Sequence, residues 1–242
     1  MKGGGKAIAR RGTRPRPPSR LTFPLRGSRS GAMHLTVKDL MKISVISGSQ
    51  RPNSQSLKVA TYLAGRLKER NVVAGDPIDL GLAPLPFWDE SAFSGASSPL
   101  NDAWKPISDE LSFCDGFVVV VPEWHGMVPP ALKNMLLLCT SELAHKPGLI
   151  VGISASSGGT YPVVELRVTG FKNNRICWIP DHVIIRGVKG MLNGTPAMDA
   201  EAEEAIKGRC DFSLAMLIEY AKALRQVRES EAFDLKTYAF GM

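Results

Sequence analysis

From residue 42 onward, the apolar residues of this chain follow two alternating patterns. Short runs rich in Val, Ile and Leu, such as 116–121, are typical of strands buried on both faces of a parallel sheet. Longer stretches with an apolar residue at every third or fourth position are typical of amphipathic helices. The predicted strands are 42–47, 72–80, 116–121, 149–154 and 175–186, and the predicted helices are 54–70, 100–113, 130–140, 161–171 and 200–228.

Five strands that alternate with helices predict an α/β fold with a doubly wound parallel sheet and helices on both faces. Glycine and proline predict local weaknesses. Gly75 and Pro77 weaken the second strand, Pro106 is expected to break the second helix, and Pro180 interrupts the fifth strand. The segment 81–99 is rich in Pro, Gly and Ser, which predicts a long surface loop.

Ligands of doubly wound sheets bind beyond the carboxyl ends of the strands, near the point where the strand order reverses. This rule selects three loops, 47–56, 122–130 and 154–161. The first contains Ser49 and Arg51 directly before a predicted helix and Ser54 and Ser56 in its first turn. Helix N-terminal amides, hydroxyl groups and a guanidinium together suit a phosphate group. The alternative is an ordinary capped helix, with Asn53 or Ser54 as N-cap.

That first loop lacks G-x-x-x-x-G-K-[ST] and G-x-G-x-x-G, so it is neither a nucleoside-triphosphate loop nor a dinucleotide fingerprint. A single phosphate monoester fits it better. The second loop carries Trp124 and His125 beside Gly126, an arrangement able to hold a flat heteroaromatic ring. The third loop carries Gly158 and Gly159, which permit close approach of the backbone to a ligand. Each of these two loops is also compatible with a purely structural turn.

Charge is distributed unevenly along the 242 residues, whose net charge is +7. Residues 1–38 hold ten basic and no acidic groups, which leaves 20 basic against 23 acidic residues in the remainder. We expect residues 1–40 to be a disordered basic extension, and we expect one compact domain to span 41–242. The extension is interpreted as a spurious upstream start, a transit peptide or a basic arm for nucleic acid. The mildly acidic remainder gives no reason to expect nucleic-acid binding.

The cysteine, histidine and hydropathy patterns argue against a metal site and against a membrane-spanning segment. The four cysteines form no C-x-x-C pair and the four histidines show no metal-ligand spacing, so no metal site is expected. Widely spaced cysteines in apolar segments are typical of reduced core residues, which favours a cytoplasmic location. No apolar run of about 18 residues is present, so no membrane association is expected.

In their order along the chain, the three loops resemble those of the NAD(P)H-dependent FMN reductase family, which is flavodoxin-like and includes quinone, chromate and azo-dye reductases. Gly48, Ser49, Arg51 and Ser54 match its G-S-x-R-x-x-S-x-N loop, with Ser56 in place of asparagine. The second motif, P-E-Y/W-N/H, is matched by residues 122–125, and the P-x-x-L-K-N element by Pro129 and residues 132–134.

The resemblance implies a five-stranded sheet of order 2-1-3-4-5, an FMN cofactor and NAD(P)H as electron donor. Hydride would pass to the flavin and on to a small-molecule acceptor such as free flavin or a quinone. The flavin does the chemistry, so no catalytic side chain is expected. The resemblance also implies a homodimer or homotetramer. The implied cofactor-binding residues are Ser49, Arg51, Ser54, Gln55, Ser56, Pro122, Glu123, Trp124, His125, Gly126, Ser156, Gly158 and Gly159.

Two other classes of protein share some of these features. A flavodoxin-type FMN electron carrier, which does not oxidise a nicotinamide, usually has a phosphate loop without arginine and a strongly acidic surface. Arg51 and the mild charge of the body argue against that class. The other class is a regulatory module whose basic head contacts nucleic acid. Neither the physiological acceptor nor the choice between NADPH and NADH follows from the sequence.

Overall fold

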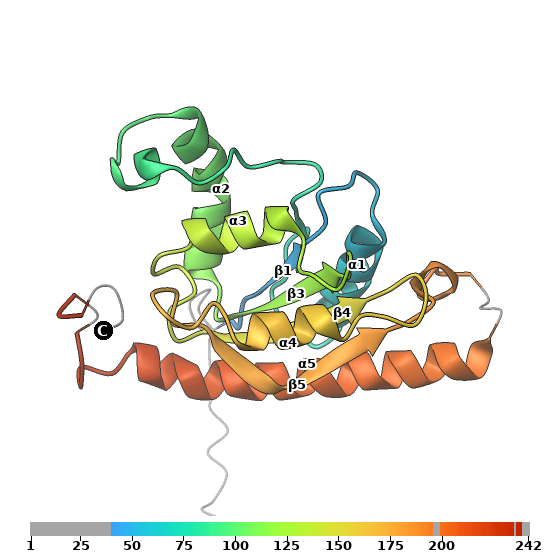
Figure 1. Cartoon of the computed structure of the whole chain (residues 1–242). Helices are drawn as coiled ribbons and strands as arrows, with labels where there is room; N and C mark the ends of the chain where they lie inside the picture. Colours follow the sequence, from blue (N-terminus) through green and yellow to red (C-terminus); the bar gives the residue numbers. More distant parts are fainter. Residues whose placement is uncertain (1–39, 196–198, 235, 239–242) are drawn as a thin grey trace, which may run out of the picture. The chain divides into compact units, whose positions relative to one another are not determined.

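The computed structural model describes residues 40–195, 199–234 and 236–238 (Figure 1). The predicted basic extension therefore lies outside the described residues, apart from Leu40. The strands are β1 Ile43–Ser47, β2 Ile78–Asp79, β3 Gly116–Pro122, β4 Pro147–Ile153 and β5 Cys177–Ile185. The α-helices are α1 Gln55–Lys68, α2 Pro99–Phe113, α3 Pro130–Leu138, α4 Tyr161–Arg167 and α5 Ala200–Arg228, and the 3₁₀ helices are η2 Glu90–Phe93 and η3 Val188–Gly190.

All five strands of the sheet are parallel, in the order β2-β1-β3-β4-β5. The predicted doubly wound sheet and its strand order are thus confirmed. β1 pairs with β3 from Ile43 opposite Gly116 to Ser47 opposite Val120. Because β2 and β3 lie on opposite sides of β1, the strand order reverses there, and the loops after β1 and β3 flank the reversal.

Alternating residues of β3 face two separate cores, as the period of a strand requires. Val118 and Val120 lie in the core that α1 and α5 cover. Phe117, Val119 and Val121 lie in the core that α2, α3 and α4 cover. All five side chains are fully buried. The sheet is therefore a middle layer between two layers of helices.

Two of the three prolines that were predicted to disrupt a helix or strand, Pro106 and Pro180, leave it continuous. α2 runs through Pro106 without a break. Pro106 is exposed, so water can solvate the carbonyl that it leaves without a helical partner. β5 runs through Pro180, which lies on an edge strand at a register shift opposite Gly148 and Ile150. A ladder hydrogen bond is dispensable at an edge bulge.

The second strand is much shorter than predicted. Only Ile78 and Asp79 pair with β1 as a strand, and Val73 forms an isolated bridge with Lys42. Gly75 and Pro77 separate the two pairings, which agrees with the weakness expected there. The segment 81–99 is largely irregular, as predicted, but includes the short helix η2.

The cysteines agree with the prediction of reduced residues. All four are free thiols, and Cys114, Cys139 and Cys210 are buried. Burial raises the pKa of the Cys210 thiol to about 12, so it is held as a neutral apolar group. No described helix is both long and apolar enough to cross a membrane.

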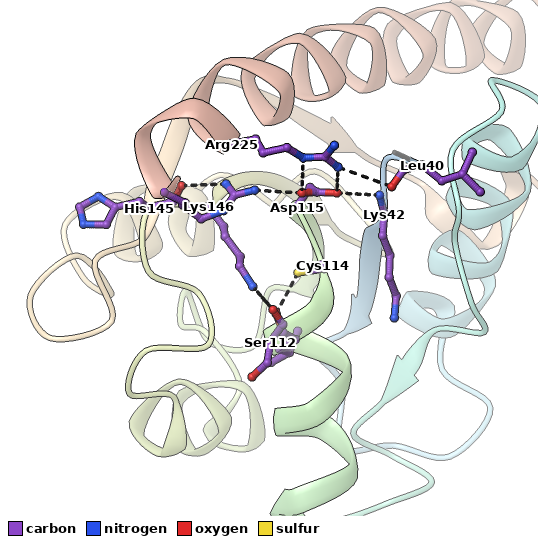
Figure 2. Close-up of polar contacts among 10 residues, drawn as sticks. Leu40, Lys42, Ser112, Cys114, Asp115, His145, Lys146 and Arg225 are labelled. Carbon is purple, nitrogen blue, oxygen red and sulfur yellow. Dashed lines mark hydrogen bonds and ion pairs between the residues drawn. The ribbon is translucent and has the colours of Figure 1, made fainter. Parts of the chain in front are cut away.

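At the amino end of the sheet, charged groups pair with one another around Asp115 (Figure 2). Arg225 donates to both carboxylate oxygens, at 3.0 and 2.5 Å, and Arg228 donates at 2.9 Å. The backbone amide of Lys42 adds a fourth bond at 3.0 Å. Burial alone would raise the pKa of Asp115, but the hydrogen bonds from Arg225 and Lys42 and the two guanidinium charges lower it overall. This cluster fixes α5 against the start of β3.

Candidate functional site

The first loop is organised by its own hydroxyl groups. Ser54 is the N-cap of α1, and its Oγ accepts a hydrogen bond from the Leu57 amide at 3.0 Å. Ser49 Oγ accepts from the Arg51 amide at 3.2 Å. These bonds shape the loop before any ligand binds. They also decide between the two predicted caps, since Asn53 has a left-handed φ of 51° and lies before the cap.

Two polar atoms in the first turn of α1 are buried without a hydrogen-bond partner among the described residues. They are Gln55 Oε1 and Ser56 Oγ. Buried polar groups in native proteins nearly always have hydrogen-bond partners. Two unpartnered atoms side by side therefore indicate that a ligand or water binds here. The first amides of a helix also lack intrahelical partners. Hydroxyl and amide donors at this place fit a phosphate group.

Arg51 connects the first loop to the second. Its guanidinium lies 5.5 Å from the centroid of the Trp124 ring, within cation–π range. It forms no ion pair with another described residue, so its charge is not neutralised within this part of the chain. A planar, exposed cation in the same loop region as the hydroxyl groups of Ser49, Ser54 and Ser56 is suited to a doubly charged phosphate.

The second loop is a tight two-residue hairpin. Trp124 and Met127 exchange backbone hydrogen bonds at 3.2 and 2.9 Å. The two central residues, His125 and Gly126, have φ values of 50° and 73°. A hairpin with positive φ at both central residues is a rigid turn, and a non-glycine residue there is uncommon. The turn thus fixes the backbone from which the exposed Trp124 and His125 side chains project.

The carboxylate of Glu123 ties the second loop to the third. It accepts hydrogen bonds from the amides of Gly159 at 2.6 Å and Tyr161 at 3.2 Å. A Cβ at Gly158 would stand 2.8 Å from Glu123 Oε1, so a side chain at this position would displace the carboxylate. Glu123 commits Oε2 of its carboxylate to both of these bonds. Its side chain is a positioning group for the glycine loop.

The third loop packs against β4 and is hydrogen-bonded to the residue that follows β5. A Cβ at Gly152 of β4 would collide with the Gly159 carbonyl, so the loop folds back over its own strand only because Gly152 has no side chain. Ser154 Oγ accepts from the Ser156 amide at 3.1 Å. Arg186, directly after β5, donates to the Ser157 carbonyl at 2.7 Å. The loop is therefore fixed on both sides.

Comparison with known proteins shows the family of the chain. Residues 41–189 match the NADPH-dependent FMN reductase family. The chain belongs to this family. It is 26% identical to an NADPH azoreductase of Bacillus sp. (strain OY1-2) over 191 residues, which cover 78% of this chain and 97% of that protein.

One further protein is similar in sequence, and one solved structure is similar in fold. An NAD(P)H-dependent FMN reductase of Schizosaccharomyces pombe is 30% identical over 155 residues, 61% of this chain and 78% of that protein. The structure of a flavoenzyme NAD(P)H:(acceptor) oxidoreductase from Paracoccus denitrificans superimposes with a TM-score of 0.55 at 14% identity, over 76% of this chain and 98% of that chain. The latter likeness supports the flavodoxin-like fold alone.

For a member of the NADPH-dependent FMN reductase family, the cofactor is FMN and the electron donor is NAD(P)H, as the sequence predicted. The three predicted loops lie on the adjacent strands β1, β3 and β4, and contacts between Arg51 and Trp124 and between Glu123 and Gly159 bring them together. Among the described residues, no group of three or more His, Cys, Asp or Glu is placed to hold a metal ion.

Sequence reasoning missed two residues that shape this edge. Arg186 was predicted to be the last residue of the strand 175–186, but β5 ends at Ile185, so Arg186 lies in the loop at the carboxyl end of the sheet. Asn134 was noted only as part of a motif. Its amide donates to the Pro86 carbonyl at 2.8 Å and accepts from the Trp88 amide at 2.7 Å, which fixes the 81–99 segment beside the second loop.

Proposed function

We propose that the three-loop edge binds FMN, with the phosphate on the first loop and the ring between the second and third loops. The observation that carries this proposal is the buried hydroxyl of Ser56 in the first turn of α1, which has no partner among the described residues and can donate to a phosphate oxygen. The fixed hydroxyls of Ser49 and Ser54 and the free charge of Arg51 support the same assignment. A phosphate monoester supplies acceptors for these hydroxyl groups and for the guanidinium.

The isoalloxazine ring is assigned to the space between residues 122–126 and 156–159. When bound, the flavin supplies the hydride-accepting centre of the reaction, which takes two electrons from NAD(P)H for transfer to an acceptor. The chain's own residues then bind and orient. The His125-Gly126 hairpin presents a rigid edge, and Glu123 fixes the amides of the glycine loop. Hydride transfer depends on distance and alignment, so no side chain is assigned as acid or base.

The FMN assignment is tested by titrating the purified protein with FMN and with FAD. We expect visible flavin absorbance or quenching of flavin fluorescence with tighter binding of FMN, because the loop has room for one phosphate and no dinucleotide fingerprint. NAD(P)H oxidation with ferricyanide as acceptor then reports the turnover of the bound flavin. Equal or tighter binding of FAD contradicts the assignment.

The boundaries and the assembly belong to the same proposal. Residues 41–242 form the FMN-binding domain, residues 1–40 are dispensable, and the protein is a cytoplasmic homodimer or homotetramer. A chain that begins at Met41 is expected to retain the flavin affinity, thermal stability and NAD(P)H oxidation of the full chain. Light scattering on both chains measures the oligomeric state. A large loss of flavin on truncation, or a monomer in both chains, contradicts the corresponding part.

A further inference from the structure

The segment that follows β5, residues 186–193, forms a fourth loop at the carboxyl end of the sheet. The three loops predicted from the sequence do not include it. It contains the short helix η3 and two residues with a left-handed backbone, Gly187 with a φ of 57° and the buried Leu192 with a φ of 56°. A bulky side chain rarely adopts this conformation, so contacts with the rest of the fold must hold the segment in place.

The fourth loop is joined to the third loop by three hydrogen bonds. The amides of Gly187 and Val188 donate to carbonyls of the third loop, at 3.2 and 3.1 Å. The Arg186 side chain donates to another carbonyl of that loop at 2.7 Å. The third loop, which is assigned to the flavin ring, therefore takes part of its shape from the residues that follow β5.

Lys58 of α1 holds the fourth loop from the other side. Its ammonium group donates to the carbonyls of Val188 and Met191, both at 2.7 Å, and to Asn193 Oδ1 at 2.8 Å. An ammonium group has three N–H donors, so these acceptors use all of them. Lys58 forms no ion pair with a carboxylate of the described residues. Its polar contacts are thus committed to the fourth loop.

The position of Lys58 is unfavourable for α1 itself. Lys58 lies four residues after the N-cap Ser54, and the first turn of the helix contains no acidic residue. A cation near the N-terminus of a helix is opposed by the helix dipole. Burial lowers the pKa of Lys58, although the charge of Glu203 raises it. The compensating interactions come from the fourth loop, so the side chain stabilises this loop and not the helix.

We propose that Lys58 is a positioning residue that, from the helix assigned to the phosphate, shapes the part of the site assigned to the flavin ring. Lys58 fixes the fourth loop, and the fourth loop fixes the third. The inference rests on the proposed function. It separates Lys58 from Arg51 of the first loop. Loss of Lys58 should weaken binding of the ring whether or not the ligand carries a phosphate.

The test titrates the flavin-free full chain with riboflavin and with FMN, and quenching of flavin fluorescence measures both affinities. Lys58→Met keeps an unbranched side chain and removes its donors. We expect both ligands to bind about fivefold more weakly, because binding must then also order the loops. Asn193→Ala removes one of the three acceptors at an exposed position and should cause a smaller loss of the same kind. Lys68→Met, at an exposed position in the last turn of α1, is the matched control and should change neither affinity.

Two further measurements test the connection between the loops. Arg186→Met acts on the same loop, so the double variant Lys58→Met/Arg186→Met should lose less riboflavin affinity than the product of the two single losses. Amide hydrogen exchange of the flavin-free chain should become faster in Lys58→Met within 154–160 as well as within 186–193. A role confined to the fourth loop would leave exchange within 154–160 unchanged and would contradict the inference.

The outcomes separate the inference from the proposed function. A wild-type chain that does not bind FMN contradicts the proposed function itself. If wild type binds FMN, a loss restricted to FMN in Lys58→Met contradicts the inference, because Lys58 then acts through its charge on the phosphate. Unchanged affinities in a variant with the circular dichroism spectrum of wild type contradict it as well. If Lys58→Met does not fold, Asn193→Ala decides between the same outcomes.

Discussion

The two ends of the parallel sheet differ in whether their buried polar groups have hydrogen-bond partners. At the amino end, Asp115 is paired with Arg225, Arg228 and a backbone amide, and the buried Lys146 donates to two carbonyls of α2 at 2.6 and 2.8 Å (Figure 2). At the carboxyl end, Gln55 and Ser56 retain unpartnered buried atoms within the described residues. Charged residues alone therefore do not identify a ligand-binding site. A site is marked by polar groups that the fold leaves unsatisfied.

The amino end has one exception to this contrast. His145 Nε2 is buried without a partner among the described residues, and its ring lies 5.3 Å from that of Phe233. Burial, together with the charges of Arg175 and Arg228, lowers the pKa of His145. The imidazole is therefore held neutral against the Phe233 ring, which is compatible with a packing role.

The largest expected effect concerns the closed amino end. Asp115→Ala leaves two partly buried guanidinium groups without their carboxylate, so the free energy of unfolding should fall by about 3 kcal/mol. Thermal unfolding should show a drop of roughly 6–12 °C for a domain of this size. FMN affinity of the folded protein should not change. Asp109→Ala, which removes an exposed carboxylate of α2, is the control and should have little effect on stability.

Acid should remove the same interaction. Because the pKa of Asp115 is lower in the folded than in the unfolded state, its contribution is present above the unfolded value of about 4 and is lost as pH falls through the folded value. The difference in free energy of unfolding between wild type and Asp115→Ala should therefore shrink in acid. A difference that stays constant from neutral pH to pH 2 would show that the variant acts by packing.

The next effect sharpens the role of Glu123 at the carboxyl end. Glu123→Ala removes both hydrogen bonds that fix the glycine loop, so FMN affinity should fall about tenfold, or about 1.5 kcal/mol. Glu123→Gln keeps one acceptor and should lose less. Turnover of the FMN-saturated variants should fall by less than the 10²–10⁴-fold typical of a lost general acid or base. A thousandfold loss of turnover at full flavin occupancy would make Glu123 a proton-transfer group.

A smaller effect tests whether the unpartnered hydroxyl belongs to the ligand. Ser56→Ala should lower FMN affinity about fivefold, or about 1 kcal/mol, while the apoprotein becomes no less stable, because no internal hydrogen bond is lost. Ser213→Ala is the matched control, since Ser213 Oγ is equally buried but bonds with Asp181 and Arg209. That variant should lose stability and keep its FMN affinity. Loss of apoprotein stability in Ser56→Ala at unchanged FMN affinity would assign the hydroxyl an internal partner.

Local patterns in the sequence predicted most of the fold. The β-branched run of β3 and the apolar stripe of α5 each specify their element without reference to the rest of the chain. Pro180 shows where such reasoning ends. Its effect depends on whether β5 lies at an edge, and that is a property of the assembled sheet.

The candidate site also combines features that are visible in the local sequence with features that depend on the assembled fold. The loops and their candidate residues follow from strand ends and small residues, which are visible in the sequence. The bond between Glu123 and Gly159 joins positions 36 residues apart, and the contact of Arg51 with Trp124 joins two different loops. Such contacts depend on which strands are neighbours, so they could not be predicted from local patterns.

The most direct test of the central claim is a double-mutant cycle in which the second change is removal of the phosphate from the ligand. Wild type and Arg51→Ala are each titrated with FMN and with riboflavin. If Arg51 binds the phosphate, the variant should weaken FMN binding by about 1.5–3 kcal/mol and leave riboflavin binding unchanged. Lys68→Ala, an exposed cation at the other end of α1, should change neither affinity. Equal losses for both ligands would show that Arg51 acts by ordering the Trp124 ring, and the carboxyl end would not be a phosphate site.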